Sequence, residues 1–185
     1  MPSDSADAIT AKSLAGGGFG YGHTLAVEMP FGLALWADAN ASFYETTGQM
    51  FQSLATDLDA QLLTVGLHVT YHLWRPFSVS AGVGFGAEHA DLQLTDSMSH
   101  VASDGAWGAV GRASVRLDMI GHLRGSLAMG FRGEFGYLAT QAVGLTPVRS
   151  RDGDGDTLYL PMQESSIGRL DLGGPYFAFT FVTQF

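Results

Sequence analysis

The amino-acid sequence predicts an all-β fold, a closed, antiparallel up-and-down transmembrane β-barrel of eight strands. Three observations predict it. Apolar residues recur at every second position over segments of about ten residues, as in strands with two unlike faces. Only 15% of the 185 residues are charged, whereas a soluble domain carries about a quarter. Polar residues and glycines interrupt every apolar stretch, so none approaches the roughly 18 apolar residues of a membrane-spanning helix.

Seven segments show the alternation clearly. In chain order they are 19–29, 31–43, 63–74, 77–88, 107–119, 123–137 and 176–185. Short breaks at Pro30, Arg75-Pro76 and Gly121-His122 alternate with long ones near 45–58, 91–105 and 140–167. This rhythm is typical of transmembrane barrels, which have short periplasmic turns and longer external loops.

Closure of the sheet calls for one more strand. An unpaired backbone group inside a bilayer costs several kcal/mol, so a spanning sheet must leave no open edge, and bacterial single-chain barrels have an even number of strands. We expect the missing strand in Ser5 to Leu14, or in a hairpin within 137–166 where Thr157 to Met162 alternates poorly. Residues 1–12 are thus a flexible segment or weak first strand, and 13–185 form the barrel.

The last segment carries the most specific motif. Phe177, Phe179, Phe181 and the terminal Phe185 share one face, directly after Tyr176. With the glycine-rich run 81–86, this ending resembles the small bacterial outer-membrane β-barrel superfamily of the OmpA/OmpX type. The resemblance implies a location in the outer membrane of a Gram-negative cell and recognition of the last strand by the barrel-assembly machinery. Met1 to Lys12 lacks the features of a secretory signal, so we interpret it as a mature terminus.

The inward positions predict a charged interior. Eight strands leave a lumen that side chains just fill, and buried charges must pair. We expect a network in which Arg112, Arg116 and Arg132 engage Glu134, Asp118 and Glu88 and obstruct the lumen; the alternative is that the same charges line a narrow path for small solutes. The full inward set is Glu28, Asp38, Glu88, Arg112, Arg116, Asp118, Arg124, Arg132 and Glu134.

A weak metal motif lies in one predicted loop. Asp152, Asp154 and Asp156 resemble the opening of a calcium-binding EF-hand loop. However, Thr157 stands where that loop needs glycine, and Gln163 stands where it needs a bidentate glutamate. We therefore expect a flexible acidic loop and no cofactor, with calcium as the alternative.

Catalysis has no convincing signature. Barrel enzymes that remove acyl chains from lipid A carry a His-x-Ser pair, and none occurs in this chain. His100 and Ser103 lie near Asp96 and Asp104, but such residue types meet by chance in polar loops. His68, four residues before His72, is too distant from it for both to bind one metal and is expected to fill the lumen. We expect no enzyme, and a lipopolysaccharide-modifying barrel enzyme is the alternative.

The negative net charge argues against nucleic acid as a partner. The net charge of −9 lies mostly between the apolar segments, so no basic face is available for nucleic acid. A soluble lipocalin-like barrel would turn its charged face to water, but the proposed outer face lacks charge. The expected function is therefore a non-enzymatic barrel that contributes to outer-membrane structure or to surface-loop interactions, with outer-membrane lipid and lipopolysaccharide around it.

Overall fold

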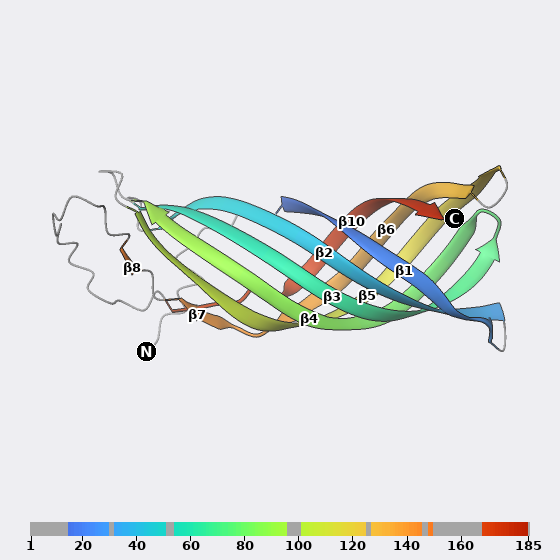
Figure 1. Ribbon diagram of the computed structural model, residues 1–185, viewed down its shortest axis with the longest axis horizontal. Helices are drawn as coiled ribbons and strands as arrows, with labels where there is room; N and C mark the ends of the chain where they lie inside the picture. The colour runs from blue at the N-terminus through green and yellow to red at the C-terminus, as the bar shows by residue number, and fades with distance from the viewer. Residues whose placement is uncertain are drawn as a thin grey trace.

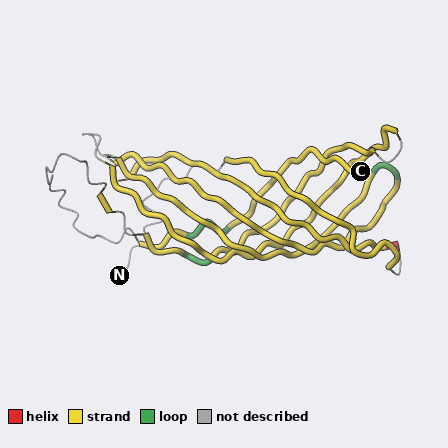
Figure 2. Tube along the Cα trace, viewed as in Figure 1, coloured by secondary structure: helices red, strands yellow, loops and turns green. Residues whose placement is uncertain are grey.

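Almost every residue that the structure describes lies in a β-strand, and the described part contains no α-helix. The computed structural model describes residues 15–29, 32–50, 54–95, 101–124, 127–145, 148–149 and 168–184. Strands make up almost all of the coloured trace in Figure 2. The predicted all-β class is confirmed.

Seven long strands form an antiparallel up-and-down sheet. They are β1 (Ala15–Met29), β2 (Leu33–Met50), β3 (Leu54–Trp74), β4 (Phe77–Thr95), β5 (Val101–Arg124), β6 (Leu127–Thr140) and β10 (Gly174–Gln184). Each pairs with its neighbour in the order β1-β2-β3-β4-β5-β6-β10. The strands are tilted and wind around one long axis (Figure 1), which gives the sheet an inner and an outer face.

Three short strands lie between β6 and β10. They are β7 (Val143–Leu145), β8 (Val148–Arg149) and β9 (Gly168–Leu170). β7 pairs with β9, and β8 adds to the edge of β5. Within the described residues no ladder joins β1 to β10. The candidate strands Ser5 to Leu14 and Thr157 to Met162 lie outside the described residues.

The two ends of the sheet differ in their connections. At one end, here called the turn end, 30–32, 75–76 and 125–126 join neighbouring strands. Gly32 lies there with a φ of 71°, a conformation that favours glycine. At the other end, called the loop end, the connections are 51–53, 96–100 and the stretch 141–173 that contains the short strands.

The outer face carries a continuous apolar belt. We define the belt as the outward positions of 19–25, 33–43, 63–73, 77–87, 107–119, 127–139 and 175–183, which contain no Asp, Glu, Lys or Arg. Phe19, Phe85 and Phe177 in the belt are more than 70% exposed. The inner positions of the same strands hold mostly glycine, small residues and charges, with a few larger side chains such as Trp36, so the alternation predicted from the sequence is confirmed.

Beyond the belt, toward the loop end, the two faces exchange their polarity. Leu58, Leu62 and Leu92 point inward and are buried, whereas Asp59 and Asp91 are exposed on the outer face. Leu58, Ala90, Leu92 and Leu94 form an apolar cluster with Val143 and Leu145. The predicted long loops at 45–58 and 91–105 are therefore mostly wrong, because these residues continue the strands with the opposite pattern.

Glycine on the inner face of β1 lets the side chains of β2 lie across it. A Cβ on Gly22 would overlap the Trp36 ring, and one on Gly20 would overlap Asn40 Oδ1. Asn40 could turn its side chain away, but the rigid indole ring of Trp36 could not yield as easily. The inward position of Trp36 therefore depends on the absence of a side chain at Gly22.

We predict that Leu92→Ala lowers the free energy of unfolding by about 2–5 kcal/mol, because it leaves a cavity in the apolar cluster. Gln93→Ala is the matched control on the outer face of the same strand and should change it by about 0.5 kcal/mol or less. Denaturant unfolding in detergent micelles measures both. Equal effects of the two substitutions would contradict the inward packing of Leu92.

Candidate functional site in the interior

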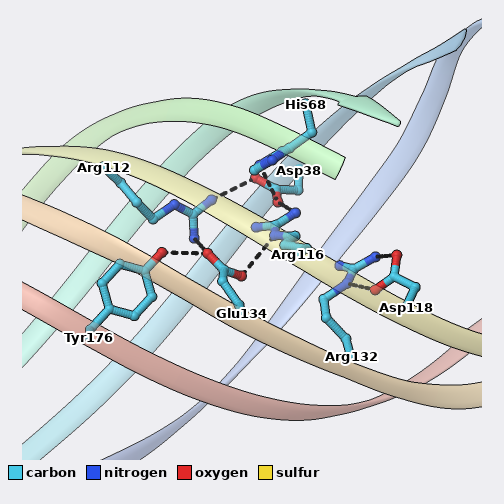
Figure 3. A network of polar contacts seen from close by, with 8 residues as sticks. All are labelled: Asp38, His68, Arg112, Arg116, Asp118, Arg132, Glu134 and Tyr176. Carbon is cyan, nitrogen blue, oxygen red and sulfur yellow. Dashed lines mark hydrogen bonds and ion pairs between the residues drawn. The ribbon is translucent and has the colours of Figure 1, made fainter. Parts of the chain in front are cut away.

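The interior is crossed by a network of charged side chains from five strands. Figure 3 shows its members converging from β2, β3, β5, β6 and β10. Each occupies an inner position because the two-residue repeat of its strand puts it opposite the apolar belt. The members are Asp38, His68, Arg112, Arg116, Glu134 and Tyr176, and the pair Asp118 and Arg132 lies beside them.

Asp38 is the anionic centre on one side of the network. Its Oδ1 accepts a hydrogen bond of 3.0 Å from Arg112 Nη2. Its Oδ2 lies 2.5 Å from Arg116 Nη1 and 3.1 Å from His68 Nε2. His68 lies on the neighbouring strand β3, whereas Arg112 and Arg116 lie on β5, which does not pair with β2, so Asp38 ties β2 to both β3 and β5.

Glu134 is the anionic centre on the other side. Arg116 Nε donates to Glu134 Oε2 at 2.8 Å, and Arg112 Nη1 lies 3.8 Å from Oε1. The Tyr176 hydroxyl donates to the same Oε1. The two arginines therefore bridge two carboxylates, and Tyr176 links the network to the last strand.

A second ion pair lies nearer the turn end. Arg132 Nε and Nη2 donate to the two carboxylate oxygens of Asp118 at 2.6 and 3.1 Å. Asp118 and Arg132 are direct cross-strand partners on β5 and β6, as are Arg116 and Glu134. This bidentate geometry is the stronger form of arginine–carboxylate pairing.

The burial of the network explains why its charges balance. Arg116 is 2% exposed, His68 1%, and Asp38 and Glu134 are below 10%. An unpaired ion in such surroundings costs several kcal/mol, so two guanidinium groups need two carboxylates. The arrangement holds strands together across the interior.

A cavity of about 850 Å³ lies between this network and the turn end. Trp36, His72 and Trp74 line it together with the serines of β4, and Arg116 and Arg132 also border it. The interior thus has three levels along its axis. They are the cavity at the turn end, the charge network and the apolar cluster at the loop end.

The apolar cluster is closed by chain segments that fold inward. Val143 and Leu145 are 5% and 2% exposed, and Leu170 and Leu172 pack against the same cluster. We call the described residues 141–145 and 168–172 the plug segment. It is anchored by Gln141 N, which donates to the Ala109 carbonyl at 2.8 Å, and by Leu172 N, which donates to Thr140 Oγ1 at 3.1 Å.

The structure brings together most, but not all, of the predicted charges. Arg112, Arg116 and Glu134 form ion pairs as predicted, and Arg132 pairs with Asp118. The prediction that Glu88 joins an arginine is wrong: Glu88 is fully buried among apolar residues, and its carboxylate oxygens have no hydrogen-bond partner in the described part. The side chains of Glu28 and Arg124 lie outside the description.

Two members of the network were missed or misassigned from the sequence. His68 was expected only to fill space, yet it contacts Asp38. Tyr176 was grouped with the terminal aromatic residues, but it points inward while Phe177, Phe179 and Phe181 are exposed on the outer face. Its even position, out of step with those phenylalanines, was the available signal.

The other candidate sites gain nothing from the structure. Asp152, Asp154, Asp156, His100 and Phe185 lie outside the described residues. Ser103 and Asp104 are neighbours on β5 and therefore face opposite sides of the sheet. Among the described residues, no group of three or more His, Cys, Asp or Glu is arranged to hold a metal ion.

Comparisons with known proteins add no family. No family model, no curated protein and no solved structure matches the chain. Among the described residues there is also no helix long and apolar enough to cross a membrane. Function must therefore be argued from the fold and the interior.

We predict that Asp38→Asn lowers the free energy of unfolding by about 3–5 kcal/mol, because it leaves two buried guanidinium groups short of an anion. Glu45→Gln, an exposed acid on the same strand, is the control and should change it by less than about 1 kcal/mol. Denaturant titration in micelles provides the measurement. A small effect of Asp38→Asn would show that the network contributes little to stability.

Proposed function

We propose that the protein is an integral β-barrel of a bacterial outer membrane with an obstructed interior, which stabilises the membrane or presents its loop end to partners. The apolar belt carries this proposal. Soluble monomers rarely expose apolar patches larger than a few hundred Å², whereas here an uncharged outer surface runs across all seven long strands.

The height of the belt matches a bilayer. On β3 it runs from Leu63 to Leu73, about 33 Å of strand at roughly 3.3 Å per residue. Strands of transmembrane barrels tilt by about 35–45°, which reduces this length to about 25 Å, the apolar height of such barrels. Trp107 lies at the loop-end edge of the belt and contacts the His89 ring in a tilted arrangement, with ring centroids 4.6 Å apart.

A membrane location also requires a closed sheet. In an up-and-down sheet of seven strands the first and last run in the same direction, and among the described residues neither β1 nor β10 has a partner at its outer edge. One added strand, antiparallel to both, would close the sheet and give an even number. The segment Ser5 to Leu14, directly before β1, is our candidate; a hairpin would add two strands and leave the number odd.

The proposed orientation follows from the connections. Barrels of this kind have short turns on the periplasmic side, so we assign the turn end, where β10 finishes, to the periplasm. Outer-membrane lipid and lipopolysaccharide would then surround the belt, and the assembly machinery would read the exposed phenylalanines of β10. Surface-loop interactions would take place at the loop end.

Insertion can be tested by quenching tryptophan fluorescence. In single-tryptophan variants we expect lipids brominated near the headgroup to quench Trp107, which is 64% exposed, and to spare Trp36, which lines the interior cavity. Equal quenching of both residues would contradict the assignment of the faces. A protein that stays monomeric in water without detergent would contradict the membrane location.

Conductance tests the obstructed interior. In planar bilayers we expect no stable single-channel openings from the purified protein, because the charge network and the apolar cluster block the axis in series. Stable openings would instead favour transport of small solutes through the same interior.

A further inference from the structure

Glu88 is a buried acid that the charge network does not use. It lies on β4 at the first inner position beyond the belt, and it is 0% exposed. Both of its carboxyl oxygens are buried without a hydrogen-bond partner in the described part of the chain. Its direct cross-strand partners are Leu62 on β3 and Gly108 on β5.

Gly108 marks the point where Glu88 meets the plug segment. A Cβ on Gly108 would lie 3.0 Å from Glu88 Oε1, 3.0 Å from Val143 Cγ1 and 3.1 Å from the Gln141 carbonyl oxygen. The carboxyl group, the plug segment and β5 therefore converge over a residue that has no side chain. Substituting even alanine there would crowd all three.

The groups around Glu88 suit a protonated acid. β3 and β5 present only apolar or uncharged inner residues here, Ala60, Leu62, Ala106 and Val110. The plug segment presents an acceptor, the Gln141 carbonyl, and a carboxylate, Asp171, which is its one charged side chain that the structure describes, because the side chain of Arg169 lies outside the description. A protonated carboxyl can donate to a carbonyl oxygen, whereas a carboxylate only accepts and would repel both groups.

Burial, together with the charge of Asp171, raises the pKa of Glu88 from 4.5 to about 7. Asp171 behaves oppositely: hydrogen bonds from Thr140 Oγ1 and the Gly173 amide lower its pKa. Asp171 therefore stays ionised over the range in which Glu88 gains or loses its proton. Glu88 therefore titrates near neutral pH beside a permanently ionised Asp171.

We propose that Glu88 is a proton-operated latch: its protonated carboxyl holds the plug segment in the loop end of the interior, and its ionisation releases that segment and admits water to the apolar cluster. The latch acts above the charge network, so release opens the loop end without opening the whole axis. It concerns contacts within the chain and does not depend on the membrane location.

The direction of the pH dependence follows from linkage. When the plug segment is released and water reaches Glu88, the pKa of Glu88 returns to its ordinary value of 4.5. When the plug segment is docked, the pKa of Glu88 is about 7. Between pH 4.5 and about 7, Glu88 is therefore protonated when the plug segment is docked and ionised when the plug segment is released. The ratio of released to docked plug segment should thus rise about tenfold per pH unit, by about 300-fold in all, and level off above the docked pKa.

Hydrogen exchange of the full chain in detergent micelles tests this latch. Exchange of 141–145 and 168–172 is followed by mass spectrometry from pH 4 to 9, with rates corrected for the intrinsic pH dependence of amide exchange. We expect the tenfold rise per unit in the unmodified protein and a flat profile in Glu88→Gln. Glu45→Gln, an exposed acid, should retain the rise. A flat profile in the unmodified protein, or an unchanged rise in Glu88→Gln, overturns the proposal.

Asp171→Asn provides a second variant that keeps an acceptor for Thr140 and Gly173. Removing the charge lowers the docked pKa of Glu88, so the rise should end at lower pH and be smaller in total. If Glu88→Gln fails to dock its plug segment at all, this variant still decides the matter. A profile identical to that of the unmodified protein would contradict the role of Asp171.

Discussion

The two-residue repeat of the strand is the constraint on which the rest of this structure depends. Once a strand pairs on both sides, each side chain is committed to one face, and a shift by one residue would exchange the faces entirely. β3 shows this along its length: Leu63 and Leu67 point outward, while His68 points inward and contacts Asp38. Belt, network and apolar cluster are consequences of a single register.

Much of the fold could be predicted because alternation is a local property of the sequence. The seven long strands and their faces followed from it, but the lengths of the strands did not. Asp57, Asp59 and Asp91 were interpreted as loop residues, since acids between apolar segments usually indicate solvent. They do face outward, yet Leu58, Leu62 and Leu92 alternate with them and fill the interior. The same two-residue pattern continued with its polarity reversed.

The interior site was predictable in kind and less so in detail. Inward arginines and acids had to pair, and Arg116 with Glu134 and Asp118 with Arg132 are cross-strand neighbours that hairpin pairing could suggest. The contact between Asp38 and Arg112 joins residues 74 positions apart, and it depends on how the sheet curves. Glu88 could not be predicted by matching acids with arginines, because it lies among apolar residues away from the arginines.

The reversal of polarity beyond the belt also sets where partners would meet this molecule. On β3 the stretch Leu54 to Leu62 continues past the belt, about 26 Å of strand at roughly 3.3 Å per residue. In this portion the inner face packs in the apolar cluster and the outer face carries exposed carboxylates. A surface that binds this portion of β3 must therefore be polar, whereas a surface that covers the belt must be apolar.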